Sequence, residues 1–411
     1  MSRLLKEEIK RQEETLGLIP SENIASRAVM ETLGSPLTNK YSEGYPDKRY
    51  YGGNGVIDKI EKLAQERTRK VFRLGSEWHV NVQPYSGSPA NMAVYYALLN
   101  PGEKIMGMSL PFGGHLTHGW KVNFSGRFYE NIQYPVGRDG FLDYEEIYKL
   151  ALREKPKIIV AGATAYPRVI DFKKFASIAY ETEAYLMADI SHVAGLIAAE
   201  AHPSPFSSAD VVTTTTHKTL RGPRGAVILA NTQSALARKN NLDMASVIDK
   251  AVFPALQGGP HDNQTAAIAV AMGEARKSSF KAYGRQIIKN AQALSENLQL
   301  EGFKLVSGGT DNHLLLLDLT DLGVSGKEAQ EKLESVGVVT NRNTIPYDTR
   351  SPFDPSGLRL GTPLVTSRGM KEKEMEIIAK LIADTVQDRK KTVEIKEEVK
   401  KLCAKFKLYS P

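Results

Sequence analysis

The chain has 411 residues, of which 41% are hydrophobic and 25% are charged, and its formal net charge is +7 at pH 7. This composition is typical of a globular protein, and the length predicts two domains with enough core to enclose an active site. The basic residues are spread along the chain among acidic ones, which argues against a nucleic-acid-binding protein; an anionic cofactor or substrate explains the charge equally well.

Cys403 is the only cysteine, so neither an intrachain disulfide nor a cysteine-rich zinc site can form. The N-terminal residues lack the apolar core of a signal peptide, and no apolar stretch reaches the ~18 residues that a membrane-spanning helix needs. We therefore expect a soluble, cytoplasmic protein that does not interact with a membrane.

Residues 1–35 read as short amphipathic helices, which we expect to form an N-terminal helical arm. From there to about residue 230, short β-rich runs alternate with helical stretches. This alternation predicts a mostly parallel sheet covered by helices on both faces, with ligands bound at the carboxyl ends of the strands. The clearest expected strands are residues 157–162, 184–189, 211–216 and 225–229.

The alternation of strands and helices changes after one long helical pattern over residues 264–300. Charged helices are expected from about residue 370 to 407, where the charge run 396–401 is best explained as a solvated helix face. We therefore divide the chain after the arm into a large domain over residues 36–275 and a smaller α+β domain over residues 276–411. The expected strands of the smaller domain are residues 303–306, 313–318 and 337–340.

One lysine follows the β-branched run Val211–Thr216, just before a turn rich in glycine and proline. Lys218 is flanked by His217, Arg221 and Arg224. A lysine crowded by cations at the end of a strand loses its proton more readily, as a Schiff-base nucleophile requires. A solvated lysine after an edge strand explains the segment equally well.

Pyridoxal phosphate needs such a lysine, an acid beside its pyridine nitrogen, a flat group over its ring and a phosphate cradle. Asp189 ends an apolar strand, where an ionised carboxylate is costly unless a group such as a pyridinium pairs it. Its alternative role is to cap a helix. The hydroxyls and glycine of Ser86, Gly87 and Ser88 precede a helix expected from Met92, which predicts an anion site or, more simply, a helix cap.

Three further segments carry candidate ligand-binding groups. His115 and His118 share a glycine-rich loop, and an imidazole stacked on a flat ring explains them better than a metal pair, because no other ligands accompany them. We expect no metal site. Arg359 lies between glycines on an apolar strand, which fits either capture of a carboxylate or a structural ion pair. The tyrosine-rich segments 39–46 and 49–53 predict a ligand wall or a subunit interface.

Together these segments resemble the serine hydroxymethyltransferases, a family of fold-type I pyridoxal phosphate enzymes. The motifs are Thr213–Gly225, Gly113–Gly119 and Leu37–Pro46, and the resemblance runs in order from about Leu18 to Thr362. It implies an α/β fold with a mostly parallel sheet of the seven-stranded type in the large domain and a smaller α+β C-terminal domain. It also implies reversible transfer of the hydroxymethyl carbon of L-serine to tetrahydrofolate, which gives glycine and 5,10-methylenetetrahydrofolate.

The same resemblance assigns roles around the cofactor. Lys218 would bond to the aldehyde of pyridoxal phosphate, Asp189 would hold the pyridinium, and His115 would stack on the ring. Two residues of the neighbouring subunit, Tyr41 and Gly259, would reach the phosphate, so that a homodimer shares its active sites. The other cofactor contacts would be His192 and Thr164 near the phenolic oxygen, His217, and the phosphate cradle of Ser86, Gly87 and Ser88.

The resemblance also assigns the substrate contacts. Arg359 and Ser21 would bind the amino-acid carboxylate, and Tyr51 would line the site. Glu43 would donate or accept a proton near the serine hydroxyl, because the cofactor leaves proton management at the hydroxymethyl carbon to the protein. The folate contacts would be Leu110, Gly114, Tyr50, Glu43 and Asn343.

Some positions depart from the commonest pattern of the family, but none removes a group that bonds the cofactor. Phe112 stands beside the folate-side loop, so the pterin pocket is where this chain is expected to differ most. The other departures are Pro20, Gly55, Tyr85, Pro89, Asp262 and Asn263.

Two alternative functions remain open from the sequence. A folate-independent aldolase for β-hydroxy amino acids would keep Lys218, Asp189 and Arg359, whereas Glu43 and Asn343 favour the transferase. A nucleic-acid-binding or scaffolding protein with the same fold is motivated only by the basic charge.

Overall fold

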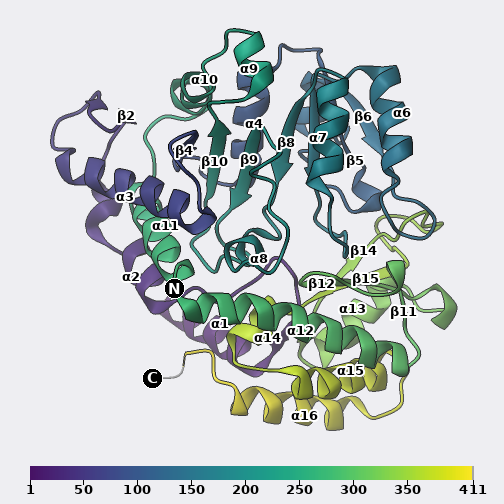
Figure 1. Ribbon diagram of the computed structural model, residues 1–411. Coiled ribbons are helices and arrows are strands. Elements are labelled where there is room, and N and C mark those ends of the chain that lie inside the picture. The colour runs from purple at the N-terminus through teal and green to yellow at the C-terminus, as the bar shows by residue number, and fades with distance from the viewer. Residues whose placement is uncertain (410–411) are drawn as a thin grey trace.

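The computed structural model describes residues 1–409, and its larger part is built on a single sheet of seven strands (Figure 1). The strands are β4 (Trp78–Asn81), β5 (Lys104–Met108), β6 (Glu130–Tyr134), β7 (Ile158–Gly162), β8 (Tyr185–Asp189), β9 (Val211–Thr215) and β10 (Ala226–Asn231). Their order is β4-β10-β9-β8-β7-β5-β6. Only β10 is antiparallel to its neighbours. The expected mostly parallel sheet is therefore confirmed.

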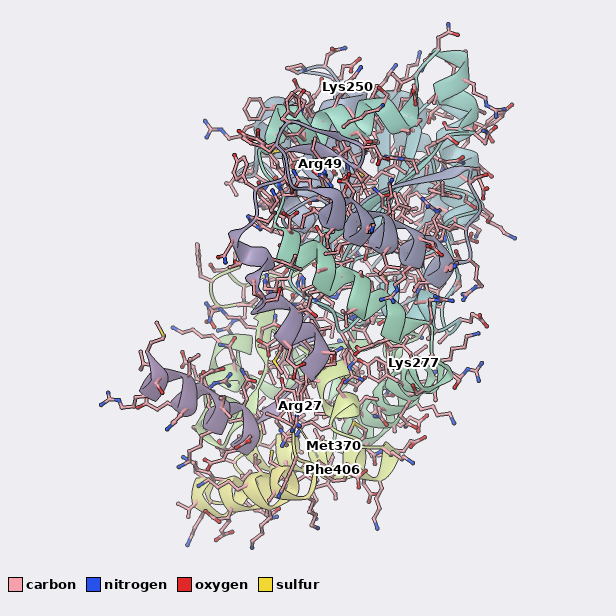
Figure 2. The ribbon with its side chains drawn as sticks, turned by 90° about the vertical axis from the view of Figure 1, so that its left-hand side faces the viewer. Arg27, Arg49, Lys250, Lys277, Met370 and Phe406 are labelled. Carbon is pink, nitrogen blue, oxygen red and sulfur yellow. The ribbon has the colours of Figure 1, made fainter. Side chains whose placement is uncertain are left out.

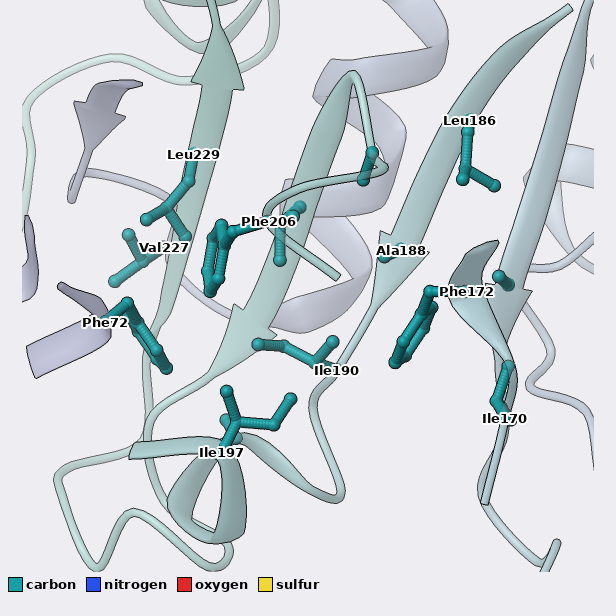
Figure 3. Close-up of a cluster of buried hydrophobic side chains, with 14 of the residues drawn as sticks. Phe72, Ile170, Phe172, Leu186, Ala188, Ile190, Ile197, Phe206, Val227 and Leu229 are labelled. Atoms are coloured by element: carbon teal, nitrogen blue, oxygen red, sulfur yellow. The ribbon is translucent and has the colours of Figure 1, made fainter. Parts of the chain in front are cut away.

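Helices cover both faces of this sheet because its strands are apolar on both sides. Leu186 and Ala188 of β8 belong to one core, together with Phe72 and Phe172 from two covering helices (Figure 3). Met187, which lies between them in the strand, belongs to the core on the other face, as the two-residue period of a strand requires. The first core is covered by α3 (Gly55–Phe72), α6 (Tyr144–Glu154), α7 (Phe172–Glu181) and α8 (Ala194–Ala198), the second by α4 (Gly87–Leu98), α9 (Ala235–Lys239) and α10 (Met244–Lys250).

The C-terminal part contains a second, antiparallel sheet of four strands in the order β11-β12-β15-β14. They are β11 (Lys304–Leu305), β12 (Leu314–Asp318), β15 (Gly357–Gly361) and β14 (Asn341–Asn343). Its helices are α13 (Gly326–Ser335), α14 (Pro363–Ser367), α15 (Glu372–Val386) and α16 (Thr392–Lys405). The smaller α+β unit is therefore present as expected. Ser410 and Pro411, which end the predicted domain, lie outside the described residues.

The strand expected at residues 337–340 forms, but it does not join the sheet of its own domain. It is β13 (Val338–Val339), and it pairs in parallel with β1 (Leu16–Gly17). Leu16 and Leu18 are fully buried in the C-terminal core. Part of the N-terminal segment is thus attached to the C-terminal core, whereas α1 (Ser2–Glu14) buries none of its residues.

The helical pattern over residues 264–300 forms two helices, so the prediction of one continuous helix was wrong. They are α11 (Asp262–Ala275) and α12 (Ser278–Leu300), and the backbone of Lys277 between them is extended, with φ −74° and ψ 151° (Figure 2). The helix α11 packs against α2 (Arg27–Leu33) and α3, whereas α12 packs against α15. The chain breaks because the two segments bury their apolar faces in different cores, at the boundary that we predict between the domains.

Figure 2 shows the two parts of the molecule one above the other, with Arg49 and Lys250 in the upper part and Met370 and Phe406 in the lower.

No helix within residues 1–409 is long and apolar enough to cross a membrane. The remaining strands and α-helix of the described residues are β2 (Gly44–Tyr45), β3 (Lys48–Arg49) and α5 (Phe124–Phe128).

Candidate active site

Lys218 lies in a closed loop between β9 and β10. The hydroxyl of Thr216 donates to the carbonyl of Pro223 at 2.6 Å, and the amide of Gly222 donates to the carbonyl of Thr216 at 2.7 Å. A Cβ on Gly222 would lie 2.7 Å from that same Thr216 oxygen, so the closure requires glycine. The lysine is 9% exposed and lines a cavity of about 510 Å³. The alternative of a solvated surface lysine is therefore wrong.

The surroundings of Lys218 favour the uncharged amine. Burial lowers the pKa of Lys218 to about 8. The negative charge of Asp189 acts in the opposite direction and raises the pKa, whereas the cations of Arg359 and Arg224 lower it further. About a tenth of the amine is then uncharged at pH 7, far more than for an ordinary lysine. A lysine in this state can act as a nucleophile toward an aldehyde.

Asp189 is an ionised carboxylate at the carboxyl end of β8. Its Oδ2 accepts from Asn91 Nδ2 at 2.9 Å and from His118 Nε2 at 3.1 Å, and its Oδ1 accepts from the amide of Ser191 at 3.1 Å. Burial opposes ionisation, but the hydrogen bond and charge of His118 bring the pKa of Asp189 well below its usual range. The next helix along the chain, α8, has Val193 as its N-cap residue, so the alternative role of Asp189 as a helix cap is wrong.

His115 presents a flat, uncharged ring to the same cavity. Its Nδ1 lies 2.7 Å from the hydroxyl of Thr117, which also accepts from Asn91 at 2.8 Å. Burial lowers the pKa of His115 to about 4, and the charge of His118 adds to the effect. Within residues 1–409, no group of three or more histidine, cysteine or acidic side chains is arranged to hold a metal ion.

The expected phosphate cradle lies at the start of α4. Ser86 is the N-cap residue, and the helix begins at Gly87, five residues before the predicted Met92, so the predicted start was wrong. The hydroxyl residues Ser86 and Ser88 line the cavity with Gly87, where unpaired amides at a helix start favour an anion. A Cβ on Gly87 would lie 2.7 Å from the methyl group of Thr215, so glycine allows this close approach.

Arg359 enters the cavity from β15 of the C-terminal sheet. Its Nη1 donates to the carbonyl of Thr164 at 2.6 Å and its Nε to Oδ1 of Asn341 at 3.2 Å. Burial lowers the pKa of Arg359 to about 10, so it stays a cation at neutral pH. Because both partners are neutral oxygens, the alternative of a structural ion pair is not supported, and the charge remains available to an anionic ligand. Ser21 lines the same cavity.

The other cofactor positions from the sequence also meet here, because Thr164, His192 and His217 all line the cavity. Two further residues, Asn91 and His118, complete the site by holding Asp189. The sequence did not single out Asn91, and it offered His118 only as a candidate for stacking on a flat ring. Asn91 follows Ser88 by almost one helical turn, a spacing that marks it as a cavity residue. The contact of His118 with Asp189 spans 71 residues and had no local signal.

The tyrosine-rich segments lie outside this cavity. The hydroxyl of Tyr41 donates to Glu43 at 2.8 Å, and the rings of Tyr41 and Tyr51 meet edge-on at 5.0 Å. Gly259 lies against Tyr41, so that a Cβ there would be 3.1 Å from the ring. Tyr50 and Tyr51 are 74% and 50% exposed. The structure thus keeps Tyr41, Glu43, Tyr50, Tyr51 and Gly259, which we call the tyrosine group, out of the cavity of their own chain.

The expected folate contacts are divided in the same way. Asn343 lines the cavity, whereas Leu110 and Gly114 belong to the loop after β5. A Cβ on Gly114 would overlap the carbonyl oxygen of Met108, so this loop cannot accept a larger residue there. Phe112 packs edge-on against Tyr347, with ring centroids 5.0 Å apart, and is not part of the cavity wall. The ring of Phe112, one of the departures from the family pattern, therefore packs between two loops.

Two other departures make contacts beside the tyrosine group. The ring of Tyr85 stacks on His261 at 4.1 Å, and its hydroxyl donates to the carbonyl of Gly259 at 2.7 Å. Asp262 accepts a hydrogen bond of 2.6 Å from the hydroxyl of Ser42, and both residues are buried. These contacts fix the backbone on both sides of the tyrosine group.

Comparison with known proteins agrees with this geometry. A family model described as "Serine hydroxymethyltransferase" matches residues 1–382. A protein named serine hydroxymethyltransferase from Desulfotalea psychrophila is 54% identical over 406 residues, which cover 98% of this chain and 92% of the relative. One of the same name from Acidothermus cellulolyticus is 56% identical over 377 residues, which cover 92% of this chain and 85% of the relative. The resemblance seen in the motifs is confirmed, and the chain belongs to the serine hydroxymethyltransferase family.

Proposed function

We infer that this protein carries out the reaction of its family, the reversible transfer of the hydroxymethyl carbon of L-serine to tetrahydrofolate, which yields glycine and 5,10-methylenetetrahydrofolate. This reaction belongs to one-carbon metabolism and to glycine and serine biosynthesis. The observation that carries the inference is the buried Lys218, with its lowered pKa, facing an ionised Asp189 across one cavity.

The residues present in the cavity fit pyridoxal phosphate, which withdraws electron density from the amino-acid Cα when it is bound. We propose that Lys218 attaches to its aldehyde and that the Asp189 carboxylate pairs with its pyridinium. The uncharged ring of His115 can stack on it without adding a buried charge. Its phosphate would lie at the start of α4, and His192, Thr164 and His217 would contact the rest of the group.

The substrate positions follow from the charges that remain. We propose that Arg359 and Ser21 bind the carboxylate of serine, since the buried guanidinium has only neutral partners in the chain. Glu43 would exchange a proton with the hydroxymethyl oxygen. Leu110, Gly114, Tyr50 and Asn343 would contact the folate.

A homodimer reconciles these roles with the position of the tyrosine group. Tyr41, Glu43, Tyr51 and Gly259 do not line the cavity of their own chain, and the three large side chains among them lie at or near the surface. We propose that they complete the cavity of a second subunit, so that each active site draws on both chains. We also propose a cytoplasmic location, because the single cysteine, Cys403, is buried and free.

The deciding experiment compares cleavage of serine with and without tetrahydrofolate. We expect the rate of glycine formation to depend on folate. A rate that does not change when folate is omitted would support the alternative, a folate-independent aldolase for β-hydroxy amino acids on the same fold, and would refute the transferase.

Replacing Arg359 by lysine is expected to raise the KM for serine by about 10- to 100-fold, with a smaller change in kcat. The reason is that a lysine keeps the charge but loses the paired donors, and a hydrogen bond to a charged group contributes roughly 1.5–3 kcal/mol. Arg342→Lys on the adjacent strand β14 is the matched control, because Arg342 does not line the cavity. An Arg359→Lys variant with an unchanged KM would contradict the carboxylate assignment.

Replacing Glu43 by glutamine is expected to lower the folate-dependent kcat by about 100-fold or more, because the amide cannot exchange a proton at the hydroxymethyl oxygen. Binding of pyridoxal phosphate, followed by absorbance, should be unchanged. Co-expression of Glu43→Gln with Lys218→Ala tests the shared site, since a mixed dimer contains one cavity with both native residues. Activity that is not restored in this mixture would contradict the contribution of Glu43 to a second subunit.

The lowered pKa of Lys218 predicts how the cofactor-free protein takes up pyridoxal phosphate. A base whose pKa is lowered gains its reactive, uncharged form at lower pH, so the rate of attachment should rise about tenfold per pH unit below 8 and level off above it. Stopped-flow absorbance between pH 6 and pH 10 measures this. A rate that continues to rise toward pH 10, as for an ordinary lysine, would disprove the perturbation.

A further inference from the structure

A second histidine, which has no part in the proposed mechanism, stands directly behind His192. His192 follows β8 and His313 immediately precedes β12, so the pair joins the two sheets of the molecule. Nδ1 of His192 lies 3.2 Å from Nε2 of His313, so the two rings meet edge to edge, with centroids 5.4 Å apart and planes tilted by 29°. Both side chains are buried, at 4% and 0% exposure.

Neither histidine of this pair is charged near neutral pH. Burial lowers the pKa of His313 to about 3, and the cations of Arg359 and Lys218 add to the lowering. Burial likewise brings the pKa of His192 well below its ordinary value. A neutral imidazole carries one proton on one nitrogen, so one of the two facing nitrogens must donate and the other must accept.

A small cavity borders the histidine pair. Its volume is about 20 Å³, and His192, His202, Asn312 and His313 are among its lining residues. That is room for one water molecule, which needs roughly 10–15 Å³ of such space and two to four polar partners. Nδ1 of His313 is buried and has no hydrogen-bond partner within residues 1–409. The cavity and the unpaired nitrogen together indicate a bound water.

The charge of the main cavity decides the direction of these hydrogen bonds. Asp189 favours a cationic group at its own side of the cavity. The charges that act on His192, however, are those of Lys218 and Arg359, so a group bound beside His192 is an anionic acceptor. His192 itself lines the cavity, and with Nδ1 engaged by His313, Nε2 is the nitrogen left to meet a ligand. An acceptor there requires the proton of His192 on Nε2, which leaves Nδ1 as the acceptor from His313.

We propose that His313 is a positioning residue: its Nε2–H donates to Nδ1 of His192 and thereby fixes the tautomer of His192 whose Nε2–H points into the main cavity, while Nδ1 of His313 accepts from one trapped water. That the acceptor in the main cavity is the phenolic oxygen of pyridoxal phosphate rests on the proposed function. The tautomers of the two histidines do not depend on that assignment.

Two substitutions separate the hydrogen bond from the packing. His313→Phe keeps a buried ring at this position but removes both nitrogens, whereas His313→Gln keeps a side-chain amide that can donate to His192. His79→Gln is the control. His79 lies on β4, pairs with Asp249 of α10, and lines neither cavity. Circular dichroism and thermal unfolding establish that each variant is folded.

The first measurement is the ¹⁵N spectrum of the eight histidines in protein loaded with pyridoxal phosphate. We expect the native protein to show His192 and His313 protonated on Nε2 and not on Nδ1. His313→Phe should give a mixture of His192 tautomers, and His313→Gln should keep the native one. A native protein with a proton on Nδ1 of His192 overturns the proposal even if His313→Phe does not fold.

The second measurement is the pH titration of the bound cofactor's visible absorbance. Loss of this hydrogen bond changes how strongly His192 stabilises the ionised chromophore, so His313→Phe should move the apparent pKa of the chromophore by about 0.7 unit, which corresponds to about 1 kcal/mol. His313→Gln and His79→Gln should stay close to native. An unchanged titration in His313→Phe overturns the positioning role. If the native protein acquires no visible band with pyridoxal phosphate, the proposed function fails, but the ¹⁵N spectrum still decides between the tautomers.

Discussion

The Lys218→Ala variant is expected to lose at least about 10³-fold in kcat, because no other lysine among residues 1–409 lines the cavity to attach to the cofactor aldehyde. It should also lose the visible absorbance of attached pyridoxal phosphate and remain unlabelled after reduction with borohydride. The substitution removes an amine whose burial disfavours its own charge, so the melting temperature of the cofactor-free protein should stay the same or rise.

Lys239→Ala is the matched control, because Lys239 is an exposed lysine that pairs with exposed Glu183 and lies outside the cavity. It should retain activity, absorbance and labelling. A Lys218→Ala protein that still fixes the cofactor on reduction, or that keeps native activity, would refute the assignment of Lys218 and with it the central part of the proposed function.

Asp189→Asn is expected to lower kcat by about 10²- to 10⁴-fold. The amide keeps the size of the side chain and can still accept from Ser191, but it removes the negative charge that would face the pyridinium. Breaking a buried charge pair by neutralising one partner costs about 3–5 kcal/mol, which corresponds to that range of rates. Steady-state kinetics at saturating serine and folate measure the loss.

A second aspartate provides the control for this substitution. Asp210 is half-buried just before β9, at the opposite end of the sheet from the cavity, and accepts from Ser234 at 2.6 Å and from the amide of Leu186 at 2.8 Å. Asp210→Asn should change stability but not kcat. Equal kinetic losses in both variants would indicate a general effect of substituting buried acids, in which case Asp189 would have no special role.

The structure also shows which of the expected site residues share one cavity within a single chain. Arg359 is held by Thr164, 195 residues away, and the tyrosine group does not line the cavity of its own chain. Motif positions gave Glu43 and Tyr51 a place at the substrate without saying from which subunit. Their position in the fold is what leads to the proposal that they act across a dimer.

Several features were already determined by the sequence. The β-branched run before Lys218 and the apolar run before Asp189 became strands because their side chains pack on both faces of a sheet, and their parallel pairing brings both residues to one edge. The serine and glycine residues at Ser86 and Gly87 are local signals for an anion site and needed no distant contact to be recognised, although the helix that they begin was predicted to start only at Met92.

Other features were decided only by the tertiary structure, because they depend on contacts between distant segments and on burial. The ionised state of Asp189 requires His118, and the lowered pKa of Lys218 requires a cavity closed by residues of both sheets. The break between α11 and α12 reflects two separate cores, which no helical periodicity reveals. The pairing of His192 with His313 joins residues 121 positions apart. Local sequence patterns specify helices, strands and candidate site residues. The protonation states and hydrogen-bond partners of those residues are set only when folding excludes water and brings the side chains together.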